Sequence, residues 1–237
     1  MVGVEGLGST LTMLIALFAT LAAIAGIVVL EGFFRDKLKE LFSDSNYFIF
    51  FFLVSGYVLY SIGELSYYLT DVIFENQAPV GIADVYWTGG AIFILISFIA
   101  LTINLFRLHF NSIKLTTMFF IGLALVISVL ILLFGVFIDQ EATFFSYFYP
   151  IASSLIVTFA LSTILFSLQL EDFGADLKFF FLASCGILLG DILFSYVTTT
   201  GIDGLPGMIS DLSYLFGYGL SLVAFIMLRL RMHRLTI

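Results

Sequence analysis

Two stretches of this sequence decide its architecture: residues 63–90, GELSYYLTDVIFENQAPVGIADVYWTGG, and residues 190–217, GDILFSYVTTTGIDGLPGMISDLSYLFG. They align without a gap at an offset of 127 residues. Apolar matches are common in so apolar a chain, so the polar, proline and glycine matches carry the evidence for an internal repeat of a helical hairpin. The matched pairs are Gly63/Gly190, Glu64/Asp191, Pro79/Pro206, Asp84/Asp211, Trp87/Tyr214 and Gly90/Gly217.

The composition predicts a membrane protein. Hydrophobic residues make up 61% of the chain, charged residues only 11%, and the mean hydropathy is +1.15, which excludes a soluble globular domain. We therefore predict an all-α integral membrane fold of seven transmembrane helices in a single domain, residues 1–237. Each predicted helix reaches the roughly 20 apolar residues that cross about 30 Å of hydrocarbon. The predicted spans are residues 8–30, 46–70, 83–106, 115–138, 145–169, 178–200 and 207–229.

The charges predict the orientation in the cell membrane. All nine basic residues fall on one side, which the positive-inside rule places in the cytoplasm, so the N-terminus lies outside and the C-terminus inside. The outer side carries acids and no base, which attracts cations and amines, repels anions and argues against nucleic-acid binding. The basic residues are Arg35, Lys37, Lys39, Arg107, Lys114, Lys178, Arg229, Arg231 and Arg234. The outer acids are Glu5, Glu64, Asp71, Glu75, Asp84, Asp139, Glu141, Asp191, Asp203 and Asp211.

Both repeated hairpins run from the inside to the outside and back, which predicts parallel repeats related by an axis along the membrane normal. The first repeat covers about residues 8–110 and the second about residues 145–237. The helix at about 115–138 has no counterpart and no ionisable residue within its apolar run, which suits a lipid-facing linker. We predict a 3+1+3 arrangement, with any functional site at the interface between the repeats. The first cytoplasmic connection, residues 31–46, is either an interfacial amphipathic helix or an extension of the first helix.

Glu64 and Asp191 are the sharpest candidates for a ligand-binding site. Each is expected in the outer half of the bilayer, where an ionised acid costs several kcal/mol unless it faces a partner, water or a cavity. No basic residue is predicted at that depth. The alternative is a protonated acid that only makes an interhelical hydrogen bond.

Asp84 and Asp211 are further ligand-binding candidates, because an aromatic residue, Trp87 or Tyr214, follows each by about one turn. We expect both acids in the first turns of their helices, and we expect all four acids to face one cavity in the outer half. A carboxylate beside an aromatic ring suits an organic cation. The alternatives are helix capping for the acids and interfacial anchoring for the rings. Tyr67 and Tyr196 add hydroxyls that line a cavity or only pack. Glycines are expected to allow close helix packing at Gly63, Gly90, Gly190 and Gly217.

Residues 189–220, and their echo at 62–93, resemble a hairpin in the multihelix membrane-sensor regions of prokaryotic signalling proteins. The matching residues are Gly190, Asp191, Asp211, Tyr214, Gly217 and Tyr218. The resemblance implies a sensory role.

Two weaker resemblances concern topology. The run Gly217-Tyr218-Gly219 and the seven helices are similar to a microbial rhodopsin, but the retinal lysine would fall near Leu215 and no lysine lies in that helix. The 3+1+3 plan is similar to the SWEET sugar transporters, without their proline–glutamine motifs. We therefore expect no cofactor. The single Cys185 and the two histidines form no metal-binding pattern, so the sequence identifies no metal ligands.

The leading functional hypothesis is a non-enzymatic sensor or receptor-like protein with an outward-facing acidic pocket for a cation or small polar or amine ligand. This hypothesis includes the lipid bilayer as a partner and allows a protein partner on the cytoplasmic face. One alternative is a small-solute or proton-coupled transporter built from two three-helix bundles. The other is an intramembrane hydrolase that uses paired acids. The apolar inner halves of the second and sixth helices favour a blind pocket over a transport path.

Overall fold

The computed structural model describes residues 2–74, 81–108, 112–137, 142–167 and 175–235. Within these ranges the chain is all-helical, and seven helices are long and apolar enough to cross a membrane, which confirms the predicted seven-helix membrane class. The helices are α1 (Val2–Phe34), α2 (Ser45–Tyr67), α3 (Ile82–Leu108), α4 (Ser112–Phe137), α5 (Phe144–Ser167), α6 (Ala175–Thr200) and α7 (Leu205–Leu235).

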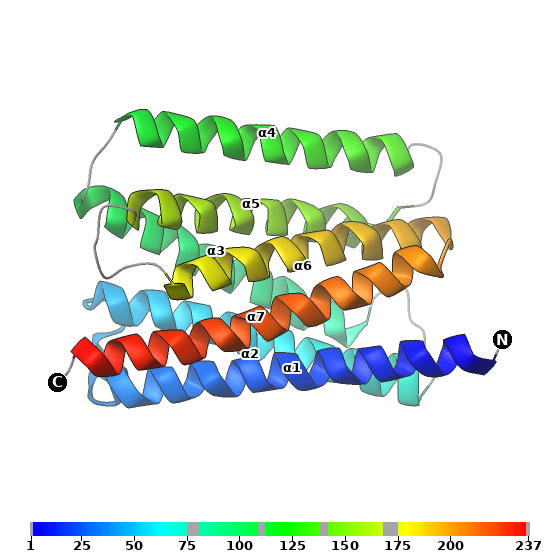
Figure 1. Ribbon diagram of the computed structural model, residues 1–237, viewed down its shortest axis with the longest axis horizontal. Helices are drawn as coiled ribbons and strands as arrows, with labels where there is room; N and C mark the ends of the chain where they lie inside the picture. The colour runs from blue at the N-terminus through cyan, green and yellow to red at the C-terminus, as the bar shows by residue number, and fades with distance from the viewer. Residues whose placement is uncertain (1, 75–80, 109–111, 138–141, 168–174, 236–237) are drawn as a thin grey trace.

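Six of the helices form a closed ring. Around it, α1 packs on α2, α2 on α3, α3 on α5, α5 on α6, α6 on α7, and α7 again on α1. The remaining helix, α4, lies outside the ring and packs mainly on α5 (Figure 1). The beginning of α1 and the end of α7 lie at opposite ends of the bundle, called the N end and the C end below (Figure 1). All nine basic residues belong to helices or turns at the C end.

Local sequence explains the start of α2 and the turn between α6 and α7. At the start of α2, the Asp44 carboxylate accepts hydrogen bonds from the backbone N–H groups of Asn46 and Tyr47, at 2.9 and 3.1 Å, as a helix N-cap does. Between α6 and α7 the chain reverses through Gly201 and Gly204, whose φ angles of 67° and 87° favour glycine.

The connection from α1 to α2 differs from both forms expected for residues 31–46. The first helix extends through Phe34, four residues beyond the predicted span, and is followed by a short 3₁₀ helix, Arg35–Glu40. Lys37 donates to the Asp44 carboxylate at 2.5 Å. This hydrogen bond raises the pKa of Lys37 and, together with the N-cap bonds, lowers the pKa of Asp44. The tight link to Asp44 favours the short turn over a continuous amphipathic helix.

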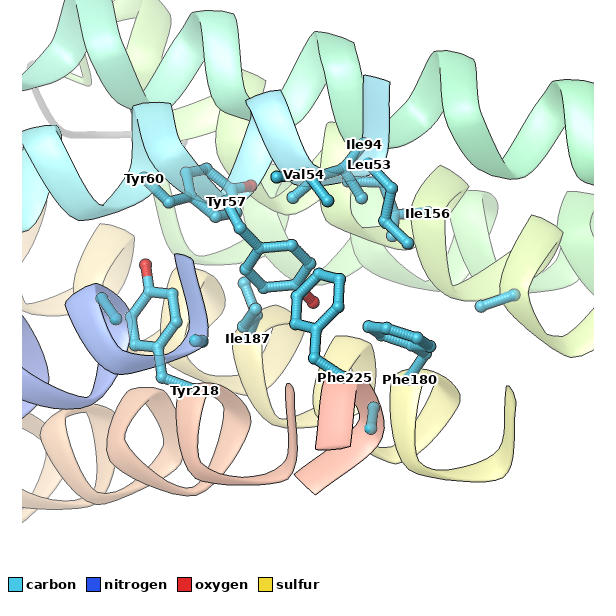
Figure 2. Packing of buried hydrophobic residues seen from close by; sticks show 14 of the residues in the cluster. Leu53, Val54, Tyr57, Tyr60, Ile94, Ile156, Phe180, Ile187, Tyr218 and Phe225 are labelled. Carbon is cyan, nitrogen blue, oxygen red and sulfur yellow. The ribbon is translucent and has the colours of Figure 1, made fainter. Parts of the chain in front are cut away.

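An aromatic cluster fills the ring in its C-end half. Tyr57 of α2, Phe98 of α3, Phe180 of α6 and Phe225 of α7 are each at most 2% exposed. Ring centroids are 5.2 Å apart for Tyr57 and Phe225, and 5.0 Å apart for Phe180 and Phe225, both edge to face (Figure 2). Such contacts leave no space between the rings. The cluster therefore closes the interior of the bundle toward the C end.

Candidate functional site

The ring brings two carboxyl groups into one buried cavity on the N-end side of the aromatic cluster. Glu64 of α2 is 6% exposed and Asp191 of α6 is 7% exposed. Because α2 and α6 are not neighbours in the ring, the two acids approach its interior from opposite sides. Both line a cavity of about 60 Å³. No lysine, arginine or histidine is among the lining residues that the structure describes.

Hydroxyl groups supply the hydrogen bonds to both acids. The Tyr218 hydroxyl donates to Oε1 of Glu64 at 2.7 Å. The Tyr214 hydroxyl donates to Oδ1 of Asp191 at 2.7 Å, and the Ser153 hydroxyl donates to Oδ2 of the same carboxyl group. Each carboxyl oxygen has two lone pairs, so these contacts leave acceptor positions open toward the cavity. The site can therefore bind a cation or a hydrogen-bond donor.

Aromatic rings pack tightly against the helices that carry the two acids. A Cβ added to Gly63 would lie 2.5 Å from Cδ1 of Trp87, and one added to Gly190 would lie 2.8 Å from Cε1 of Tyr214. Only glycine leaves room for these rings. The Trp87 indole N–H is buried beside Glu64 but makes no hydrogen bond of acceptable geometry to any residue that the structure describes. A buried donor next to an acid is a second polar group available to an occupant of the cavity.

Six of the eight ligand-binding residues predicted from the sequence line this cavity, and they are Glu64, Tyr67, Trp87, Asp191, Asp211 and Tyr214. Tyr196 is not among the lining residues. Asp84 also lies elsewhere, although we expected all four acids to share one cavity. Its carboxylate accepts the Gly81 backbone N–H at 2.8 Å and the Tyr149 hydroxyl at 2.8 Å. The hydrogen bond from Gly81 caps the start of α3, which agrees with helix capping, the alternative role given above for Asp84.

Capping does not apply to Asp211. We expected Asp211 in the first turn of its helix, but α7 begins at Leu205, which places the residue in the second turn. There it is beyond the N–H groups that lack an intrahelical partner. Its side chain lines the cavity beside Thr12 and Ile15 of α1. The first helix of the chain therefore forms one wall of the site, which we did not predict.

Several residues that line the cavity or bond to its acids were absent from the sequence prediction. Tyr218 belonged to the sensor-like pattern, but no sequence signal placed its hydroxyl beside Glu64. Ser153 is one of many hydroxyl residues on α5, and most of the others bond to the carbonyls of their own helix, as Thr158 does to Ser154. Only the packing of α5 on α6 distinguishes Ser153. Tyr60, Tyr149 and Phe194 complete the aromatic part of the wall.

No metal centre is present among the residues that the structure describes, where no group of three or more His, Cys, Asp or Glu side chains converges. His109 lies outside the described residues, and so does Pro79. Cys185 is a free thiol, half-buried on α6. The cavity therefore offers carboxyl, hydroxyl and aromatic groups.

Comparison with known proteins gives no further guide: no family model, no curated protein and no solved structure matches this chain. The functional conclusion rests on the site itself.

Proposed function

We propose that this protein is a non-enzymatic membrane sensor whose acidic cavity binds a small cation or compact amine from the outer side. One observation carries the proposal: Glu64 and Asp191 converge, buried, on a cavity whose described lining holds no base. A buried carboxylate without a counter-charge is costly, and a bound cation removes that cost. The resemblance of residues 189–220 to membrane-sensor hairpins points to the same class.

Contacts that recur at the 127-residue offset support the proposed 3+1+3 repeat. A Cβ on Gly90 would meet Tyr60 and the Gly56 carbonyl, and a Cβ on Gly217 would meet the equivalent positions, Ile187 and the Ala183 carbonyl. The pairs Gly63–Trp87 and Gly190–Tyr214 are related in the same way. The order of helices in the ring stays the same when α1, α2 and α3 are replaced by α5, α6 and α7, and α4 lies outside the ring. An axis along the bundle then passes between Glu64 and Asp191.

The distribution of charge supports an outward-facing cavity. The basic residues gather at the C end, which the positive-inside rule assigns to the cytoplasm. The cavity then belongs to the outer half, on the N-end side of the aromatic cluster. A field of outer acids without bases raises the local concentration of cations.

The helix α7 is placed to report occupancy of the cavity. Three hydroxyl groups lie along one face of α7. Tyr214 donates to Asp191, Tyr218 donates to Glu64, and Ser221 donates to the Tyr57 hydroxyl. A cation in the cavity competes with these hydroxyls for the carboxyl oxygens. A ligand shifts a conformational equilibrium only by its difference in affinity for the two states. If the hydrogen bonds from α7 differ between the empty and the occupied cavity, the cation has a different affinity for the two states of the helix. Because α7 continues to the C end, its change of state reaches that end of the bundle.

The alternatives receive less support. A carrier needs a path to the C end, and the cluster of Tyr57, Phe180 and Phe225 blocks it (Figure 2). An aspartyl hydrolase needs two carboxyl groups that share a proton across about 3 Å. Among the described residues, Glu64 and Asp191 each bond to hydroxyls and not to one another.

The proposal is tested by the thermal stability of the purified protein with ammonium, methylammonium and alkali-metal chlorides at constant ionic strength. We expect a saturable rise in Tm for at least one cation, and loss of that rise in Glu64→Gln and Asp191→Asn. Asp203→Asn, at an exposed acid that does not line this cavity, is the matched control and should keep the rise in Tm. A Tm that no cation raises, or a rise that both cavity variants retain, removes the proposal.

A further inference from the structure

A second, larger pocket lies nearer the N end than the acidic cavity and is called the vestibule below. It is formed by the end of α2 and the short π-helix that follows it, Tyr68–Ile73, together with the first turns of α3, the first turns of α5 and the end of α6. Its volume is about 480 Å³, within the roughly 300–1,000 Å³ that is usual for organic ligands. The acidic cavity, at about 60 Å³, is far below that range. The two compartments therefore accept occupants of different size.

An aromatic septum, formed by Tyr67, Trp87, Tyr149 and Phe194, separates the compartments. These four side chains line both of them. The Trp87 ring lies 5.5 Å from Tyr67, 6.2 Å from Tyr149 and 6.3 Å from Phe194, centroid to centroid. Rings at these distances are in direct contact, so no ligand atom fits between them. An organic molecule in the vestibule rests on the septum and does not reach Glu64 or Asp191.

The charge of the vestibule selects the class of occupant. Asp71 and Asp84 line it, and no lysine, arginine or histidine is among its described lining residues. Anions are therefore repelled. An organic cation gains Coulombic attraction to the carboxylates and cation–π attraction to the septum, whereas a neutral molecule gains neither.

A buried polar group without a partner supports a built site. Ser195 lines the vestibule and is only 1% exposed, yet its hydroxyl makes no hydrogen bond among the described residues. Native structures rarely leave such a group unpaired. By contrast, the neighbouring hydroxyls of Thr143, Ser146 and Thr199 bond to one another. The Ser195 hydroxyl is therefore free to bond to a polar substituent of an occupant.

We propose that the vestibule is a binding site for an organic ammonium ion with a hydroxyl or similar polar group, held by Asp71, Asp84 and the septum. The proposal does not require the acidic cavity to bind anything. Instead it adds a site that differs from the cavity in volume and in the acids that line it.

Trp87 provides the measurement. It is the only tryptophan of the chain and lies in the septum, so its fluorescence responds to an occupant of the vestibule. The probe is choline chloride, titrated into the full-length protein in detergent against sodium chloride of equal concentration. Its neutral isostere, 3,3-dimethyl-1-butanol, has nearly the same shape without the charge. We expect a saturable change in emission with choline and none with the isostere.

Variants assign the site. Asp71→Asn and Asp84→Asn should each weaken choline binding roughly tenfold, the effect of one lost carboxylate close to an ammonium ion. Asp84 also caps α3, so Asp71→Asn remains decisive where Asp84→Asn fails to fold. Glu64→Gln, beyond the septum, should bind choline as the natural chain does. If choline gives no saturable change, if the isostere gives the same change, or if only Glu64→Gln weakens binding, the vestibule is not this site. The last result would place choline in the acidic cavity, whereas failure of the acidic cavity leaves the vestibule result unchanged.

Discussion

Removing the Tyr218 hydroxyl tests whether Glu64 depends on α7. The hydroxyl donates to Oε1 of Glu64 at 2.7 Å, and both side chains are buried. In Tyr218→Phe the ring still packs on Tyr60, 6.2 Å away between centroids, so little but the hydrogen bond is lost. A buried acceptor left without its donor costs about 1–3 kcal/mol. Glu64 has no second described donor of acceptable geometry, so we expect the upper half of that range.

The same change at Asp191 provides the comparison. In Tyr214→Phe, Asp191 keeps the hydrogen bond from Ser153, so the expected loss is smaller, about 1 kcal/mol. Tyr86→Phe serves as the neutral control, because Tyr86 is partly buried on α3 and lines neither compartment. Free energies of unfolding are measured by reversible denaturation in mixed micelles. The expected order of loss is Tyr218→Phe, then Tyr214→Phe, then Tyr86→Phe.

A double-mutant cycle decides whether the loss belongs to the hydrogen bond. When both partners of a buried hydrogen bond are replaced by apolar groups, the net effect is often close to zero. Tyr218→Phe should therefore cost much less in a Glu64→Met background than in the natural chain. An equal cost in both backgrounds would show that packing, not the bond to Glu64, accounts for the effect, and would remove the basis for α7 as the reporter of occupancy.

Three further predictions concern the frame around the site. Gly63→Ala should lower stability by about 1–3 kcal/mol and shift the Trp87 emission, because its Cβ would meet the indole at 2.5 Å, whereas Gly8→Ala, with nothing within 4 Å, should not. Asp44→Ala should cost about 1 kcal/mol at neutral pH through the lost N-cap. Folding lowers the pKa of Asp44, so its contribution to the free energy of unfolding is present at pH values above its ordinary pKa of 3.8 and is lost as the pH falls through the folded-state pKa. A difference in unfolding free energy between the variant and the natural chain that persists in strong acid would contradict this. Arg231→Met should cost about 3 kcal/mol in unfolding free energy, because it leaves Asp176, 3% exposed, without the arginine that bonds to it at 2.9 Å, and an unchanged midpoint would show that water reaches this acid.

The sequence was sufficient for the helices because their signal is local. Runs of about 20 apolar residues and the turns between them define seven spans, and most boundaries agree with the structure within a few residues. The larger differences are at both ends of α1 and at the end of α7. At the end of α1, Phe34 packs on Tyr47 of the next helix, with centroids 5.4 Å apart. Such a contact extends a helix beyond its apolar run, and no local pattern reveals it.

The site was only partly predictable, because its acids are unusual in their own segments and their partners are not. Glu64 and Asp191 are conspicuous in apolar helices. By contrast, Tyr218 and Ser153 belong to residue types that recur throughout the chain, and only the order of helices in the ring selects them. Asp84 was assigned to the wrong compartment for a related reason. The sequence places it one turn from Trp87, but it cannot show that Trp87 belongs to a septum with a compartment on each side.

The proposed repeat and the observed hydrogen bonds together explain how one frame holds two different acids. Positions that match at the offset of 127 make the same packing contacts, as Gly63 and Gly190 do with their rings. The polar contacts differ. The Tyr214 hydroxyl donates to Asp191, whereas the indole N–H of the equivalent Trp87 has no hydrogen-bond partner in the described part of the chain. Glu64 instead accepts a hydrogen bond from the Tyr218 hydroxyl, and the residue equivalent to Tyr218 is Ala91. Donors to both acids therefore come from α7, and α3, its counterpart, contributes the buried indole N–H. Ser153 of α5 adds a second donor to Asp191, so α7 is the one helix in the described part of the chain whose hydroxyls donate to both acids. Under the proposed function, a cation in the cavity therefore acts on α7 through both acids, as a sensor with a single output helix requires.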